Sequence, residues 1–190
     1  MKLTLLDGTE NDDFTAQFII KSLNKIINEK NWNIDSYTLR DIEIAHCRGD
    51  FLCWVKSPGS CINSESSREI AESCIQCDLM VFLTPVTFGG YSYQLKKAVD
   101  HLIQNISPFF NKVQGETHHH KRYEKYPSLL VLGTLPKPDA EDEAIFKKLA
   151  HRNSINFYPK QYASAVFYHS QESEEISNRI STTLIEAGAN

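Results

Sequence analysis

Two loops in the sequence carry residues that could bind a nucleotide. The first, loop 1, reads Asp7-Gly8-Thr9-Glu10-Asn11-Asp12-Asp13-Phe14-Thr15, and it lies between an apolar run and an amphipathic stretch. The second, loop 2 (residues 84–92), combines a proline, aromatic side chains and the pair Gly89-Gly90. A loop that leads into a helix can direct free backbone N–H groups at an anion, and paired glycines let the backbone approach a flat ring closely. Together the two loops predict a site for a nucleotide with a phosphate and a large aromatic ring.

Short apolar runs alternate with longer amphipathic stretches, which predicts an α/β fold around a parallel sheet. The apolar runs predict strands at 2–6, 34–38, 79–84, 128–133 and 162–168. Apolar residues recur at three- and four-residue steps in the predicted helices, which span 13–29, 66–76, 92–106, 139–151 and 171–187. Right-handed crossovers between five such units favour a doubly wound sheet of order 2-1-3-4-5. Ligands bind such a sheet where the strand order reverses, which is between loops 1 and 2.

The central strands and the start of the second helix can also be predicted. The runs LMVFL and LLVL are apolar throughout, as strands buried on both faces should be, so the third and fourth strands form the centre of the sheet. Ser66 and Glu69 have the spacing of a capping box, which predicts that the second helix begins at Ser66. Residues 39–65 and 107–127 interrupt the alternation of predicted strands and helices, and we expect them to be long functional loops.

Composition excludes several classes of function. The chain has 190 residues, a length typical of one domain over residues 1–190, with 20 basic and 24 acidic residues and a formal net charge of -4. This balance provides no basic surface for nucleic acid or an anionic membrane. The longest apolar run is far shorter than the ~18 residues that span a bilayer, and Asp7 ends the first apolar run too early for a signal peptide. We therefore expect a cytoplasmic protein whose partners are small molecules or proteins, with no nucleic-acid or membrane partner.

Loop 2 and the residues after it resemble the isoalloxazine-binding segment of flavodoxin-like NAD(P)H-dependent FMN reductases. The resemblance rests on Thr84-Pro85-Val86-Thr87-Phe88-Gly89-Gly90-Tyr91-Ser92-Tyr93-Gln94-Leu95-Lys96 and on Asp100. It implies a flavodoxin-like three-layer sandwich, FMN as the cofactor, and NADPH or NADH as the hydride donor. It also implies an oxidoreductase, commonly a homodimer, whose electron acceptor is a small molecule such as a quinone or a flavin.

The same resemblance assigns the cofactor-binding residues. Loop 1 would hold the FMN phosphate through the backbone and hydroxyl donors of Gly8, Thr9, Asn11 and Thr15. Loop 2 would cradle the ring with Pro85, Val86, Thr87, Phe88, Gly89, Gly90 and Tyr91. A third side would come from Gly133 and Thr134, which follow the fourth strand. No catalytic side chain is expected, because the flavin carries the hydride chemistry and the protein positions it.

Loop 1 departs from the family pattern in its charge. Family members usually have a basic or neutral phosphate loop, whereas this loop contains Asp7, Glu10, Asp12 and Asp13, and no Lys or Arg follows until Lys21. Repulsion of a phosphate dianion predicts FMN binding weakened by about tenfold or more, unless the carboxylates point away or a basic group comes from elsewhere. The alternative is a flavodoxin-like protein without functional FMN that acts as a binding or regulatory partner.

A cysteine-rich segment leaves several kinds of chemistry open. The chain has five cysteines, an odd number, which favours thiols or metal ligands over a disulfide framework. The segment with Cys47, Cys53 and Cys61 resembles the cysteine-bearing loop of a family branch that includes the iron–sulfur flavoproteins, but Asp50 replaces the second of four ligands. The alternatives are an iron–sulfur cluster that relays electrons, a zinc site completed by Asp50 or His46, and free thiols in a structural loop.

Two other clusters of potential ligands favour roles other than metal binding. Cys74 and Cys77, at the end of the second helix, are expected to be buried packing thiols. The three consecutive histidines in residues 117–123 cannot all face one ion from a regular element. We expect this basic loop to fold over the flavin or across a dimer interface, with its cations near the flavin or the NAD(P)H phosphates, or else to be a solvated loop.

Overall fold

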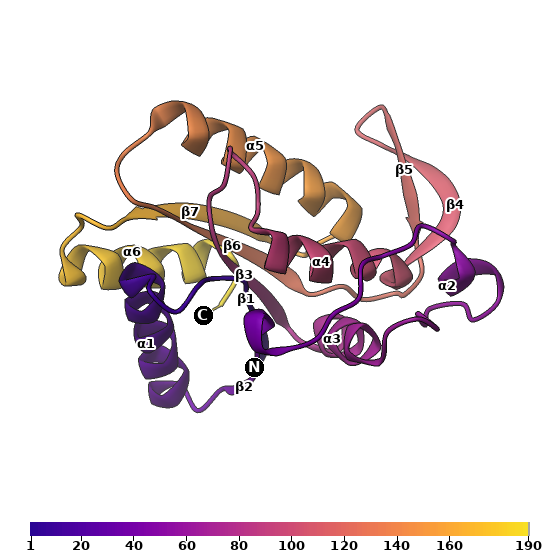
Figure 1. Ribbon diagram of the computed structural model, residues 1–190, viewed down its shortest axis with the longest axis horizontal. Helices are drawn as coiled ribbons and strands as arrows, with labels where there is room; N and C mark the ends of the chain where they lie inside the picture. Colours follow the sequence, from indigo (N-terminus) through magenta and orange to yellow (C-terminus); the bar gives the residue numbers. More distant parts are fainter. Residues whose placement is uncertain (190) are drawn as a thin grey trace.

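The computed structural model describes residues 1–189, which form a parallel sheet with helices on both faces (Figure 1). The sheet has the order β2-β1-β3-β6-β7. Its strands are β1 (Lys2–Asp7), β2 (Asn33–Thr38), β3 (Leu79–Pro85), β6 (Ser128–Leu135) and β7 (Tyr162–Tyr168). The main helices are α1 (Phe14–Glu29), α3 (Glu65–Gln76), α4 (Tyr93–His101), α5 (Ala140–Phe157) and α6 (Ser173–Glu186). The predicted α/β fold and strand order are confirmed.

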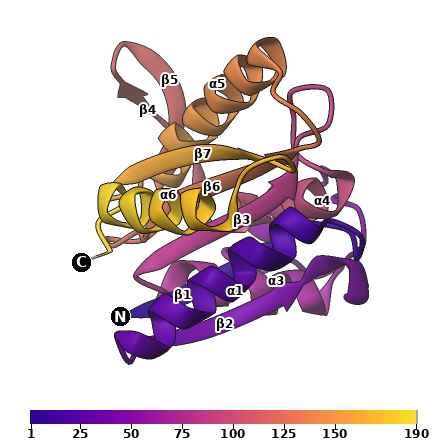
Figure 2. The same ribbon diagram turned by 90° about the vertical axis from the view of Figure 1, so that its left-hand side faces the viewer.

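The helices create two apolar cores, one on each face of the sheet. Helices α1 and α6 pack together on one face (Figure 2), where Leu5, Ile19 and Ile180 are buried. Helices α3, α4 and α5 cover the other face, where Leu6 and Phe146 are buried. Adjacent residues of β1 serve different cores because successive side chains of a strand point to opposite faces. None of the described helices has the length and apolarity that crossing a membrane requires.

The central strands β3 and β6 contain the two runs, LMVFL and LLVL, that are apolar throughout. Every residue of β6 is buried, and in β3 only Pro85 is partly exposed. The parallel register pairs Leu79 with Ser128 and Thr84 with Gly133. The two strands therefore end side by side and bring the segments that follow them to one edge of the sheet.

Helix α3 begins earlier than the capping box predicts. Its N-cap is Ser64, whose hydroxyl accepts a hydrogen bond from the Ser67 backbone N–H at 3.3 Å. Ser64 has the extended backbone of an N-cap residue, whereas Ser66 already lies in the first helical turn. The prediction of Ser66 as the cap is wrong, because several closely spaced serines offer similar capping patterns.

The two segments predicted as long loops contain regular structure. Residues 107–127 contribute most of an antiparallel hairpin, β4 (Ile106–Val113) with β5 (Glu116–Lys121). Its turn residues, Gln114 and Gly115, both have positive φ, as tight two-residue hairpin turns require. The other segment includes the turn η1 (Leu39–Asp41) and the short helix α2 (Leu52–Val55). Helix α4 gives way to the turn η2 (Leu102–Asn105), and α5 is longer than predicted.

The position of the α3 cap can be tested with two serine variants. Ser64→Ala should lower the free energy of unfolding by about 1 kcal/mol, because it leaves an N–H of the first turn without its partner. Ser66→Ala should change it by less than half of that. Chemical denaturation measures both, and a larger loss for Ser66→Ala would contradict the observed cap.

Candidate functional site

Loops 1 (residues 7–15) and 2 (residues 84–92) meet at the carboxyl ends of β1 and β3. The Gly8 N–H donates to the Leu83 carbonyl at 2.8 Å, and the Ser92 hydroxyl donates to the Gly8 carbonyl at 2.6 Å. A Cβ atom at position 8 would lie 2.7 Å from a side-chain carbon of α4, so only glycine permits this approach. The structure therefore brings the two loops together as the strand order predicts.

The end of β6 adjoins loop 2 and provides the third side. The Thr134 carbonyl accepts a hydrogen bond from the Val86 N–H at 2.9 Å. A Cβ atom at Gly133 would lie 2.8 Å from both Val86 and Phe146, so this contact also depends on glycine. All three predicted segments thus converge on one edge of the sheet.

Loop 2 makes a tight turn that exposes Phe88. Thr87 and Gly90 exchange backbone hydrogen bonds of 3.0 and 2.9 Å, and the two residues between them have positive φ. The Phe88 side chain is 97% exposed. Gly89 packs so closely on Ile145 of α5 that a Cβ atom would lie 2.4 Å from its Cγ2. Loop 2 therefore rests on α5 through Gly89 and presents Phe88 to solvent.

Tyr91, also predicted to contact the flavin, packs beneath loop 2. Its ring lies edge-on to Phe82 and Phe146, with centroid distances of 6.3 and 5.9 Å. The Asn153 side chain donates to the tyrosine hydroxyl at 3.3 Å. Burial raises the pKa of Tyr91 to about 12, so the hydroxyl stays protonated at neutral pH. In this structure the side chain belongs to the core.

Two buried carboxylates of loop 1 accept hydrogen bonds from donors that were expected to bind the cofactor or lie beside it. Asp7 accepts from the Thr9 N–H at 3.0 Å and from its hydroxyl at 2.6 Å. Asp13, the N-cap of α1, accepts from the Ala16 N–H at 2.8 Å and from the Thr134 hydroxyl at 2.6 Å. Thr9 and Thr134 were both expected to bind the cofactor, and here both donate to carboxylates of the chain itself.

The other polar residues of loop 1 differ in their exposure. Asn11 is exposed, and its carbonyl accepts from the Gln17 amide at 2.6 Å, while Thr15 is buried in the first turn of α1. Glu10 and Asp12 are exposed to solvent. Two of the four carboxylates of loop 1 are therefore exposed, whereas those of Asp7 and Asp13 are buried within it.

A basic group reaches loop 1 from η1. The Arg40 guanidinium donates to the Asp7 carboxylate at 3.1 Å and to the Thr9 carbonyl at 3.0 Å. Its buried Nε has no partner among the described residues. Loop composition alone does not reveal Arg40, which lies far away in sequence. The signal for it is the strand register, which pairs Asp7 with Thr38, two residues before Arg40.

The contacts of loop 1 test whether the residues present fit the phosphate of FMN. The expected place for the phosphate is the N-terminus of α1, where backbone N–H groups attract anions. Asp13 already caps this terminus, and a phosphate there would compete with its carboxylate for the Ala16 N–H and the Thr134 hydroxyl. The phosphate end of FMN therefore does not fit these donors as they are arranged.

The cysteine segment does not present a set of metal ligands. Cys47, Cys53 and Cys61 line a small cavity of about 30 Å³ together with Asp50. Among residues 1–189, no three His, Cys, Asp or Glu side chains are arranged to hold a metal ion. The Asp50 carboxylate accepts from the Leu52 N–H at 3.1 Å and from the Asn63 amide at 2.8 Å, so it closes the loop. This arrangement does not fit an iron–sulfur cluster or a zinc ion.

The thiols at the end of α3 are buried, as predicted. Burial raises the pKa of Cys74 well above its ordinary value and that of Cys77 to about 11. The Cys77 thiol donates to the Cys74 carbonyl at 3.2 Å. Both thiols therefore remain protonated at neutral pH, which suits packing rather than redox chemistry.

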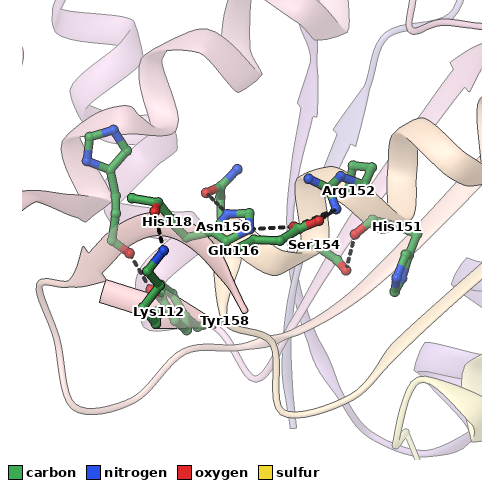
Figure 3. Close-up of polar contacts among 10 residues, drawn as sticks. Lys112, Glu116, His118, His151, Arg152, Ser154, Asn156 and Tyr158 are labelled. Atoms are coloured by element: carbon green, nitrogen blue, oxygen red, sulfur yellow. Dashed lines mark hydrogen bonds and ion pairs between the residues drawn. The ribbon is translucent and has the colours of Figure 1, made fainter. Parts of the chain in front are cut away.

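A polar network fixes the hairpin to α5 (Figure 3). Arg152 donates to both carboxylate oxygens of Glu116, at 2.6 and 2.8 Å. The His118 ring lies 3.0 Å from an oxygen of Glu116 and 3.0 Å from the Asn156 side-chain oxygen. Hydrogen bonds with His118 and then with Arg152 hold the pKa of Glu116 below its usual range. His118 thus has a structural role.

The hairpin lies away from loop 2 of its own chain. Its contacts are with Arg152 and Asn156, in the carboxyl-terminal half of α5, whereas loop 2 packs on Ile145 in the other half (Figure 1). The expectation that residues 117–123 fold over the flavin therefore gains no support from the contacts within one chain. The alternative of a dimer interface stays a prediction.

A cavity of about 790 Å³ opens at the opposite edge of the sheet, where the strands begin. Its lining includes Leu79, Tyr126, Ser128, Tyr158 and Lys160, and no residue of loop 1 or loop 2. Ligands of open α/β sheets bind at the carboxyl ends of the strands. We therefore place the candidate site at the loops and not in this cavity.

Comparisons with known proteins agree with the fold. A curated iron–sulfur flavoprotein of Methanocaldococcus jannaschii is 27% identical over 100 residues, which are 53% of this chain and 51% of that protein. The match thus spans about half the length of this relative.

Two solved structures share the fold along the whole chain. An NAD(P)H:quinone oxidoreductase from Methanothermobacter marburgensis has a TM-score of 0.70 at 13% identity and covers 100% of this chain and 98% of its own. An FMN-dependent NADH-azoreductase from Bacillus anthracis, solved in complex with FMN, has a TM-score of 0.64 at 13% identity and covers 100% of both chains.

The family itself is identified by a sequence model that matches residues 1–116, more than half of the chain, and is described as NADPH-dependent FMN reductase. The description of this family names FMN and NADPH. The resemblance seen in loop 2 is therefore confirmed, and the protein belongs to the NADPH-dependent FMN reductase family.

Proposed function

We propose that the protein is an FMN-dependent NAD(P)H oxidoreductase that passes electrons to a small-molecule acceptor such as a quinone or a flavin. The proposal depends on one observation, the convergence of loop 1, loop 2 and the end of β6. This is the point where the strand order reverses and where open α/β sheets bind nucleotides. A quinone oxidoreductase and an azoreductase of similar fold support an acceptor of this kind.

In this proposal the chain binds and orients the flavin and supplies no catalytic side chain. The flavin provides the hydride chemistry when bound. The ring would lie against loop 2, from Pro85 to Tyr91, and against Gly133 and Thr134. The ribityl end would lie along loop 1, near Gly8, Thr9, Asn11 and Thr15.

We propose one domain over residues 1–190, located in the cytoplasm, where a reducing environment suits five free cysteines.

A second candidate function is a binding or regulatory partner without functional FMN. The observation that favours it is the occupation of loop 1 donors by Asp7 and Asp13. Electron relay through a metal centre has no such support, because the cysteine segment does not fit a metal ion or a cluster.

We also propose a homodimer formed through the hairpin and the cysteine segment. An aromatic row joins them: Phe51 stacks on Trp54, Trp54 contacts His119, and His119 contacts Phe110, with centroid distances of 5.1, 4.8 and 4.8 Å. Phe51, Phe109 and Phe110 remain largely exposed. A two-stranded hairpin is marginally stable in water by itself, and a second copy of this chain would cover its aromatic side chains.

Flavin binding distinguishes the two functions. Titration with FMN should quench flavin fluorescence and saturate in the micromolar range, and the loaded protein should oxidise NADH or NADPH faster when a quinone is added. The absence of saturation would contradict the oxidoreductase. Binding without any nicotinamide oxidation would contradict the proposed hydride donor.

Phe88 provides a test of where the ring binds. Phe88→Ala should raise the Kd for FMN by about two- to tenfold, the effect of losing one aromatic contact, without changing stability, because the side chain is exposed. Ile185→Ala, which shortens an exposed apolar side chain of α6, is the control and should leave the Kd within about twofold. Equal effects of the two variants would argue against a ring on loop 2. Gly89 is unsuitable for this test, since a larger side chain there would collide with Ile145.

The homodimer can be tested by light scattering after size-exclusion chromatography. The native protein should have twice the 21.7 kDa mass of one chain. The double variant Phe109→Ser, Phe110→Ser should be monomeric at the same concentration, whereas Ile185→Ser, at an exposed position of α6, should remain dimeric. A monomeric native protein would contradict the proposal.

A further inference from the structure

The Asp13 carboxylate has an unusual place for a helix cap. It is buried at the N-terminus of α1, where it accepts the Ala16 N–H at 2.8 Å, and it also accepts the Thr134 hydroxyl from β6 at 2.6 Å. The His169 ring lies 3.7 Å from the same carboxylate. Asp13 therefore joins the start of α1 to the end of a central strand.

Comparison with the cap of α5 separates this role from ordinary capping. Asp139 is exposed, and within residues 1–189 it accepts only from N–H groups of its own helix, those of Glu141 and Asp142. Asp13 takes one donor from its own helix and one from a different element, which lies on the predicted third side of the flavin site. A simple cap does not require the second bond.

The charges near Asp13 leave it without a matching arginine or lysine. Arg40 pairs with Asp7 at 3.1 Å, so that acid and base cancel. The described ion pairs give Asp13 only His169, at a longer distance. A phosphate dianion placed at this N-terminus would face an uncancelled carboxylate that already occupies the favourable end of the helix dipole.

We propose that Asp13 acts as a built-in anion at the phosphate end of the flavin site, so that the protein accepts riboflavin, a flavin without phosphate, nearly as well as FMN. The inference rests on the proposed function, because it concerns the specificity of the same site. Recognition then comes from the ring and the ribityl hydroxyls, and FMN is bound weakly enough to exchange. Asp13 is a specificity-determining residue in this view.

The test is a comparison of the Kd values for FMN and riboflavin, measured by quenching of flavin fluorescence at fixed ionic strength. Native protein should bind riboflavin within about threefold of FMN. Asp13→Asn should lower the Kd for FMN by about tenfold and leave that for riboflavin unchanged. Asparagine also caps helices well, and thermal unfolding checks that the variant is folded.

The control is Asp12→Asn, which removes the same charge one residue earlier, where the side chain is exposed. It should shift the FMN Kd by less than about threefold.

Two results would overturn the inference and leave the oxidoreductase intact. One is a native protein that prefers FMN over riboflavin by more than about thirtyfold, and the other is a folded Asp13→Asn variant with unchanged FMN binding. If neither FMN nor riboflavin binds to any of these proteins, both the proposed function and this inference are overturned. The native comparison decides the matter even if the variant does not fold.

Discussion

The end of β1 lies so close to the start of α4 that residue 8 has to be glycine. Two hydrogen bonds, from the Gly8 N–H to Leu83 and from the Ser92 hydroxyl to Gly8, join the strand ends across the point where the sheet order reverses. Since β6 follows β3 in parallel register, this junction also fixes where Gly133 and Thr134 lie relative to loop 2. The candidate site thus depends on close approach of the backbone at the ends of buried strands. Its glycines therefore determine the positions of the loops more than its larger residues do.

The polar groups on this rigid frame differ from those that a phosphate site requires. The anions of loop 1 are its own buried carboxylates, and Arg40 forms an ion pair with one of them, Asp7. The internal hydrogen bonds of Asp7 and Asp13 satisfy donors that would otherwise be free. Family membership therefore favours FMN binding, whereas the contacts of loop 1 disfavour a phosphate. A flavin site with weak phosphate recognition is consistent with both.

The fold could be predicted from the sequence because its determinants are local: apolar runs for β3 and β6, helical periodicity for α1, and turn residues between them. The loops were predicted to meet because strand order follows from chirality and chain length. Arg40 could not be found in this way, since its contact with Asp7 depends on the register of β2. The hairpin was missed for a different reason: its strands carry charged and aromatic residues without clear alternation, and its turn, Gln114-Gly115, lacks the usual asparagine or aspartate. The burial of Tyr91 depends on its contacts with Phe146 and Asn153 of α5, which the sequence of loop 2 does not reveal.

The most direct test of the site is a map of the backbone amides that respond to flavin, measured by NMR on isotope-labelled protein during a titration with FMN. The account predicts that the amides of loop 2, of Gly133 and Thr134, and of loop 1 shift together with one saturation curve. Shifts concentrated around Tyr126, Tyr158 and Lys160 would instead place the flavin in the cavity at the amino ends of the strands, and would contradict the account.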